Sequence, residues 1–340
     1  MQPLACGKAY YFDSRGDLTF TVGDPEKGDT YDVVVCSRTV ARSSTVFSAM
    51  LFGGFAESRP EGGRWKVSLP EDQVAPLFLA FKLIHGYHEN TPKTLDKNEL
   101  YQLLVVTEKF DMARILRPWA ATWFEPYKGI PSVEGNEIVM WIAWELGHER
   151  CFRRLATDLL IKSRVSDDGE LLSKEGIPLN TYNCLEPLGI LESVAQSRSK
   201  LIETMTGFLH DVIQEALTKR QCQYSGGGHC STCGMTTGPS SEQCAAFVLG
   251  LLTHMFSDAG LQGLVSSQAT KFRYLGSSKD FLRIIQRMRF KITEGHDCCD
   301  PLPALQKRAK DLVEAAPSPV TEQHLEYLRN QAKKTGILGK

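Results

Sequence analysis

Residues 46–58 of this chain read VFSAMLFGGFAES. Apolar side chains fill most of the first seven positions, and Gly53 and Gly54 follow them at once. Glycine commonly ends a helix because it adopts the left-handed backbone that closes the last turn. Ser44, just before the apolar run, carries the hydroxyl that helix N-caps prefer. The segment therefore predicts a short helix between Ser44 and the glycines. Its expected core residues are Val46, Phe47, Met50 and Leu51.

Phe55 and Glu57 lie directly after this predicted helix, in a turn that should face water. A large apolar side chain gains little in such a place unless another protein covers it. We therefore predict that Phe55 and Glu57 contact a partner protein. The alternative is that Phe55 packs as an ordinary surface residue against its own chain.

The neighbouring segments predict a mixed fold at the N-terminal end. Alternating or β-branched runs are typical of strands, and the first two runs are close enough to form a hairpin. The predicted strands cover 17–22, 31–35 and 65–69. Apolar residues at helical spacing predict helices that open at Pro70 and cover 98–111 and 113–124, the last interrupted by Pro118.

Residues beyond 131 show only helical patterns. They cover 136–163, 186–220, 241–258, 278–292, 301–316 and 321–334, with a polar linker at 164–182. The expected fold class is an α+β domain with a three-stranded sheet and helices, over residues 10–127. An all-α C-terminal domain is expected to follow over 131–340, and this length agrees with two domains.

An ordered set of motifs in the N-terminal part resembles a BTB/POZ domain. The motifs are Asp17-Leu18, Val22-Gly23, Val35-Cys36, Val40-Ala41, Ser44-x-Val46-Phe47-x-Ala49-Met50-Leu51 and Gly53-Gly54-Phe55-x-Glu57-Ser58. The resemblance covers roughly residues 10–127, and the whole chain resembles fungal BTB-domain proteins with a helical C-terminal half. In members that recruit cullins, the resemblance implies a hydrophobic-x-Glu element at the position of Phe55 and Glu57.

The resemblance implies a protein–protein interaction adaptor, which could recruit substrates to a cullin ubiquitin ligase. The partners of such an adaptor would be a cullin or another BTB protein, together with a client protein. The resemblance leaves open whether the chain forms a homodimer. The alternative is a nuclear or transcriptional regulator that self-associates through the BTB domain and binds nucleic acid through a basic helix. That helix would lie within residues 279–291 and carry Arg283, Arg287, Arg289 and Lys291. A solvated basic face is the favoured interpretation of it.

A cysteine-rich loop at residues 222–244 is the second candidate site. A Cys-x-x-Cys turn presents two thiolates to one ion, and a structural zinc takes four sulfur or nitrogen ligands. We expect one structural zinc held by four of Cys222, Cys230, Cys233, Cys244, His296 and Cys299. Buried thiols without metal and a redox Cys-x-x-Cys are the alternatives, and the redox alternative lacks the βαβ context that it requires.

Charge and composition exclude several classes of function. The 340 residues hold 39 Lys and Arg against 40 Asp and Glu, so no overall field attracts nucleic acid or a membrane. No nucleophile–base pair or paired-carboxylate motif can be identified, so an enzyme is not expected. The N-terminal residues show no signal-peptide core, and the longest apolar run, residues 244–252, is about half of a membrane span. We expect an intracellular protein of the cytoplasm, the nucleus or both.

Overall fold

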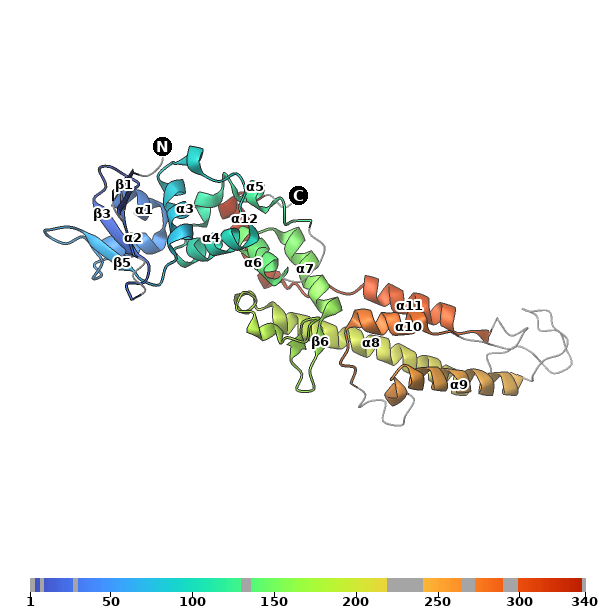
Figure 1. Cartoon of the computed structure of the whole chain (residues 1–340). Coiled ribbons are helices and arrows are strands. Elements are labelled where there is room, and N and C mark those ends of the chain that lie inside the picture. The colour runs from blue at the N-terminus through green and yellow to red at the C-terminus, as the bar shows by residue number, and fades with distance from the viewer. Residues whose placement is uncertain are drawn as a thin grey trace. The chain divides into compact units, whose positions relative to one another are not determined.

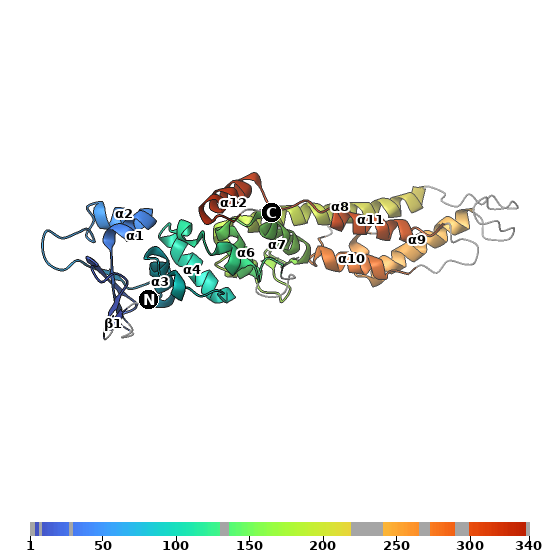
Figure 2. The same cartoon turned by 90° about the horizontal axis from the view of Figure 1, so that it is seen from above.

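The computed structural model of the chain describes residues 4–6, 9–26, 30–129, 136–218, 241–264, 273–289 and 299–337. The chain divides into two compact units, whose residues can be followed by colour in Figures 1 and 2. Unit 1 combines residues 1–155 with 320–340, and unit 2 is residues 156–319. None of the helices in the described ranges has the length and apolar content that a membrane crossing needs. The fold is mixed α+β, and most of its elements are helices.

Unit 1 contains a five-stranded sheet in the order β1-β2-β4-β3-β5. β3 and β4 pair antiparallel, which confirms the predicted hairpin, and β5 pairs parallel to β3. The prediction of three strands was too low because β1 and β2 have three residues each, too few to show a strand pattern. The strands are β1 (Leu4–Cys6), β2 (Ala9–Tyr11), β3 (Leu18–Val22), β4 (Tyr31–Val35) and β5 (Lys66–Leu69).

Helices pack against this sheet through an aromatic core. The Phe47 ring stacks on Phe110 at 4.2 Å between centroids, and Phe20 stacks on Phe81 at 5.5 Å.

The predicted break at Pro118 is confirmed, because a 3₁₀ helix ends before it and α5 begins after it. The helices are α1 (Ser37–Ser43), α2 (Thr45–Phe52), α3 (Val74–Ile84), η1 (His88–Asn90), α4 (Lys97–Lys109), η2 (Ala113–Leu116), α5 (Ala120–Phe124), α6 (Asn136–Leu146), α7 (Glu149–Lys162) and α12 (Glu322–Thr335). α7 crosses the boundary between the units.

Asp17, the first residue of the opening motif, holds the start of α1. Its carboxylate accepts hydrogen bonds from the backbone N–H and the hydroxyl of Ser37, both at 2.8 Å. Burial alone would raise the pKa of Asp17, but the two hydrogen bonds from Ser37, a backbone hydrogen bond of Asp17 itself and the charge of Arg59 together leave the pKa below its usual value. The motif residue therefore has a structural role, which is to satisfy donors at a helix N-terminus.

The last helix, α12, belongs to unit 1 and packs against α6 and η2. The Trp144 ring stacks on Tyr327 at 4.1 Å, and the Thr335 hydroxyl donates to the carbonyl of Leu146 at 2.7 Å. Gly147 (φ +78°) lets the α12 backbone approach, because a Cβ there would overlap the backbone of Leu328. The compact units therefore fall at different residues from the predicted ranges 10–127 and 131–340. An amphipathic terminal helix does not reveal in sequence which distant segment it packs against.

Unit 2 is built mainly from four helices that run side by side in Figures 1 and 2. α8 contacts each of α9, α10 and α11. A hairpin of two-residue strands interrupts the predicted all-α domain, because the polar linker folds back on itself. The elements are β6 (Arg164–Val165), β7 (Leu171–Leu172), η3 (Leu179–Thr181), η4 (Glu186–Leu188), α8 (Ile190–Thr218), α9 (Ser241–Asp258), η5 (Gln262–Leu264), α10 (Ser278–Arg287) and α11 (Leu302–Glu314).

Arg198 on α8 fastens two loop segments of unit 2 to this bundle. Its buried guanidinium donates to the carbonyls of Ser163 and Tyr274, both at 3.3 Å, and also to the carbonyl of Gly276. Burial lowers the pKa of Arg198 to about 10, so the side chain stays cationic at neutral pH. Several carbonyl dipoles thus replace the water that this charge has lost.

Candidate functional site

α2 exposes one apolar face and buries the other. Phe47 and Leu51 are fully buried, whereas Val46 is 37% exposed and Met50 is half-buried. The prediction that Val46 and Met50 are core residues was therefore wrong. Residues four apart share a helix face, so Phe47 and Leu51 point inward together. Val46 and Met50 share a second face, which is turned toward solvent. α2 has apolar side chains on both sides, and burying one set leaves the other near solvent.

The start of α2 is fixed by Ser44, as the sequence predicted. The Ser44 hydroxyl oxygen accepts a hydrogen bond from the backbone N–H of Phe47 at 2.9 Å. The same hydroxyl donates to the carbonyl of Phe110, the residue after α4. One side chain therefore caps α2 and ties it to the end of α4, so the exposed face of α2 has a rigid support.

The loop after α2, residues 53–58, is held by side-chain hydrogen bonds and by a backbone hydrogen bond from the Ser58 N–H to the carbonyl of Phe55 at 3.0 Å. The Ser58 hydroxyl accepts from the N–H of Gly54 at 3.0 Å and donates to the carbonyl of Met50 at 3.2 Å. The Trp65 indole N–H donates to the carbonyl of Glu57 at 2.8 Å. Gly54 has φ +82°, a conformation that other residues rarely adopt. These hydrogen bonds therefore hold Phe55 in a defined position at the surface.

Phe55 is 61% exposed, and its ring forms one wall of a shallow hollow of about 470 Å³. This docking hollow is lined by Thr45, Val46, Ala49, Met50, Phe55 and Glu57. Six large apolar side chains are exposed among the described residues, and Val46, Phe52 and Phe55 are three of them. Such crowding of exposed apolar residues within one short segment is typical of an interaction surface.

The structure thus brings the two predicted contact residues, Phe55 and Glu57, into one hollow and adds four that the sequence reading missed. Val46 and Met50 were assigned to the core, and Thr45 and Ala49 were not singled out by the sequence. One signal in the sequence could have identified them. The predicted helix is short and apolar on all sides, so one of its apolar faces was bound to stay near the surface.

The predicted zinc ligands fall mostly outside the described residues. Cys222, Cys230, Cys233 and His296 lie there, while Cys244 and Cys299 are buried side chains. Among the described residues no group of three or more His, Cys, Asp or Glu is placed to hold a metal ion. The structural zinc stays a prediction, which metal analysis of the purified protein with reduced thiols would decide.

The basic helix is α10, and its polarity is well separated. Phe281 and Ile285 are buried while Arg283 and Arg287 are exposed, as is Arg289 just after the helix ends, and Lys291 lies outside the described residues. Arg283 pairs with Asp280 at 3.0 Å, and Arg289 donates to the carbonyls of Gln286 and Met288. Local partners thus occupy two of these three arginines, which agrees with a solvated basic face.

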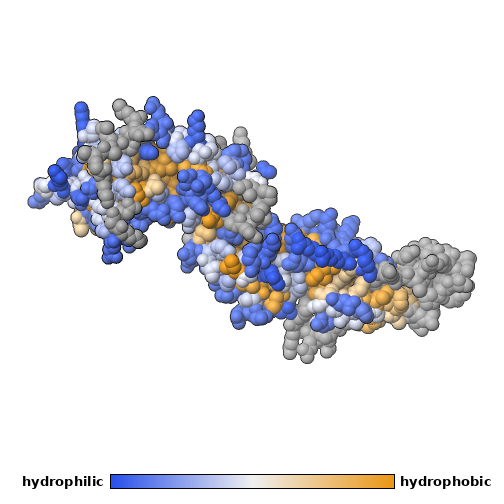
Figure 3. Space-filling view, viewed as in Figure 1, coloured by the Kyte–Doolittle hydropathy of each residue, from blue (hydrophilic) through white to orange (hydrophobic). Residues whose placement is uncertain are grey.

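Over the helices of unit 2, Figure 3 shows a mixed surface with an apolar area over α9. Phe247 on α9 is 44% exposed and contributes to it. Phe247 is a suitable control for Phe55 because both are phenylalanines with an exposed side chain.

The comparisons with known proteins assign no family. No protein-family model matches this chain, and no curated protein matches it.

Proposed function

We propose that this chain is a protein-interaction adaptor of BTB/POZ type that binds a partner through the docking hollow. A cullin scaffold of a ubiquitin ligase is the proposed partner, and a client protein would be bound elsewhere on the chain. The observation that carries the proposal is the 61% exposed Phe55 on a loop held by hydrogen bonds, beside the exposed apolar face of α2.

Phe55 would act as the anchor of this interface. An aromatic side chain that a partner covers completely typically costs about 2–4 kcal/mol of binding free energy on truncation. Glu57 is exposed at the rim of the hollow, so its charge would affect the association rate more than the lifetime of the complex. A well-ordered loop supports this role because little conformational entropy is lost on binding.

The experiment compares the purified full chain with its Phe55→Ala and Phe247→Ala variants. Binding of a purified cullin N-terminal region is measured by calorimetry, and melting is followed by circular dichroism. We expect Phe55→Ala to weaken binding at least about 30-fold, with the melting temperature nearly unchanged. Phe247→Ala should leave binding unchanged, because it tests the loss of an exposed phenylalanine elsewhere in the chain.

Three outcomes would contradict the proposal. If Phe55→Ala melts much lower and its folded fraction binds normally, the ring is a packing residue. If the wild-type chain does not bind the cullin region, the partner is wrong. Duplex DNA binding that weakens steeply with salt would instead support the nuclear-regulator alternative, because phosphate contacts release counterions.

A further inference from the structure

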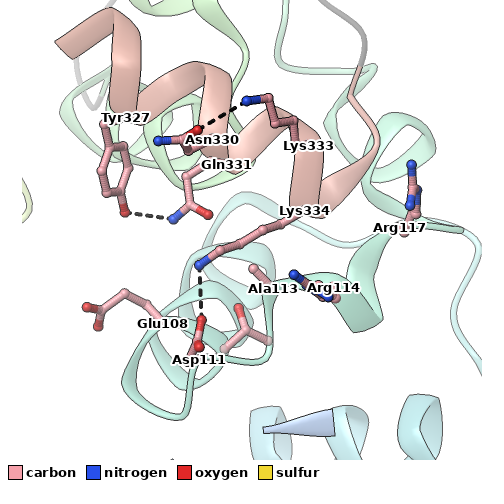
Figure 4. A pocket seen from close by; sticks show the side chains of 11 residues that line it. Glu108, Asp111, Ala113, Arg114, Arg117, Tyr327, Asn330, Gln331, Lys333 and Lys334 are labelled. Atoms are coloured by element: carbon pink, nitrogen blue, oxygen red, sulfur yellow. Dashed lines mark hydrogen bonds and ion pairs between the residues drawn. The ribbon is translucent and has the colours of Figure 1, made fainter. Parts of the chain in front are cut away.

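A second hollow of unit 1 lies between η2, the end of α4 and α12, and it is shown in Figure 4. This basic pocket has a volume of about 880 Å³. It is lined by Thr107, Glu108, Asp111, Ala113, Arg114, Arg117, Tyr327, Asn330, Gln331, Lys333 and Lys334. Four of these residues are cationic and two are acidic, so the pocket carries an excess of positive charge.

Two of the four positive charges are in excess over the two carboxylates of the pocket. Lys334 forms an ion pair with Asp111 at 3.0 Å, drawn as a dashed line in Figure 4. Within the part of the chain that the structure describes, Arg114, Arg117 and Lys333 form no such ion pair, and all three are exposed. The stem of Arg117 lies against Gly336, where a Cβ would approach its Cγ to 2.8 Å. This contact restrains Arg117 at the pocket wall.

Asp111 joins the basic pocket to the docking hollow. One carboxylate oxygen accepts from Lys334 in the pocket, and the other accepts at 2.7 Å from the hydroxyl of Thr45, which lines the hollow. Asp111 has φ +47°, the one positive value at a described residue other than glycine. Such a backbone costs about 1 kcal/mol or more and persists where side-chain contacts hold it. The two hollows are therefore neighbours across a single carboxylate.

We propose that the docking hollow and the basic pocket form one binding surface for a partner protein that carries an acidic segment next to its apolar anchor. This inference rests on the proposed function and specifies the chemistry of the partner. The apolar side chain would lie against Phe55, and carboxylates of the partner would face Arg114 and Arg117. Arginine suits this role because its planar guanidinium binds carboxylates through two parallel hydrogen bonds.

A nucleic acid or a small phosphate compound fits the joined surface less well. A base of a nucleic acid can stack on Phe55, but it offers little aliphatic surface for Val46 and Met50, which also make the hollow apolar. The chain also has nearly balanced charge, with 39 basic and 40 acidic residues, so no overall field would concentrate polyanions at this pocket. A protein segment offers apolar and acidic side chains on one surface.

The test uses a random peptide library displayed on phage and selected on the full-length chain. Parallel selections use the Arg114→Glu/Arg117→Glu double variant, Phe55→Ala and the control Arg329→Glu. Arg329 is exposed on α12, pairs with Glu322 and does not line the pocket. We expect wild type and Arg329→Glu to select peptides with an apolar residue beside Asp or Glu, and the double variant to select apolar peptides without acids.

Titration of one selected peptide gives the magnitude. The double variant should bind it about 10–100-fold more weakly, mainly through slower association, with at most a twofold change for Arg329→Glu. A version of the peptide with Lys in place of its acids should bind the double variant better than wild type, which a merely structural effect would not produce.

The outcomes separate the inference from the proposed function. Selected peptides that depend on Phe55 but lack acidic residues, or that bind the double variant as tightly as wild type, would overturn the inference alone. Selection of no peptide that depends on Phe55 would overturn both. An equal loss of affinity for the acidic and the Lys-substituted peptide would show that charge reversal had damaged the fold, and the inference would be rejected.

Discussion

α2 and α10 are both short helices that carry several apolar residues, and they use them in opposite ways. α10 buries Phe281 and Ile285 and turns its arginines to solvent, so its polarity matches its burial. α2 buries Phe47 and Leu51 but leaves Val46 and Phe52 exposed. A helix of the α10 kind is explained by folding alone. Phe52 meets the Trp65 ring at 5.7 Å between centroids, but Val46 and Phe52 stay exposed, so burial in the core does not account for this apolar face.

The largest expected effect separates the two faces of α2. Phe47→Ala removes a ring that stacks on Phe110 at 4.2 Å and is fully buried. It should lower the free energy of unfolding by about 3–5 kcal/mol. Val46→Ala, one residue away, should change it by less than about 0.5 kcal/mol because Val46 is 37% exposed. Urea unfolding of both variants measures this, and equal losses would show that α2 has no separate binding face.

A similar loss is expected in unit 2 from a polar residue. Arg198→Met keeps an unbranched side chain but leaves the carbonyls of Ser163, Tyr274 and Gly276 without their donor. We expect a loss of about 2–4 kcal/mol, since each buried acceptor loses its partner. Hydrogen exchange should rise first in residues 156–218 and 273–289. If exchange rises instead in the sheet of unit 1, the guanidinium does not act within unit 2.

The pH dependence of unit 1 should report Glu145 on α6. Burial raises its pKa to about 7 from 4.5, although the Tyr327 hydroxyl donates to it at 3.0 Å. A carboxyl with a raised pKa stabilises the folded state fully below about pH 4.5, and this contribution is lost as pH rises through about 7.

Glu145→Gln cannot ionise, so it removes this loss. Gln331 Nε2 donates to Glu145 Oε2 at 3.2 Å, and turning the Gln331 amide over lets its side-chain oxygen, which lacks a hydrogen-bond partner among the described residues, accept from the new amide. The variant should be more stable than wild type by about 2 kcal/mol near pH 8 and should show no advantage near pH 4. Melting curves between these pH values decide it, and parallel curves would mean that Glu145 does not titrate in this range.

The smallest effect concerns the loop that presents Phe55. Ser58→Ala removes the bonds to Gly54 and Met50, while Ser48→Ala is a matched control on an exposed part of α2. A less ordered loop must be fixed on binding, so we expect partner affinity to fall about 3–10-fold with stability lowered by about 1 kcal/mol or less. Affinity equal to that of Ser48→Ala would show that the loop needs no such support.

Local features of the fold were readable from the sequence because they depend on neighbouring residues. Ser44 as an N-cap, the two glycines after α2 and the interruption at Pro118 each follow from the backbone chemistry of one or two side chains. The sheet was harder to predict, since β1 and β2 have three residues each and form only by pairing with other strands.

The candidate site was predicted in part. Phe55 and Glu57 stood out because a helix stop placed them in a turn, and both line the docking hollow. Val46 and Met50 were assigned to the core because an apolar run does not say which of its faces will be covered. The basic pocket was not predicted at all, since its walls come from residues 107–117 and 327–334.

The sequence by itself determined where α2 begins and ends, the interruption at Pro118, the mixed character of the N-terminal part and the exposed position of Phe55. These properties follow from hydrogen bonding and allowed backbone angles within a few residues. Only the tertiary structure decided that α12 packs on α6, that α2 keeps one apolar face uncovered and that Asp111 joins Thr45 to Lys334. Those results depend on contacts between residues far apart in the chain, and they form only when the whole of unit 1 packs together.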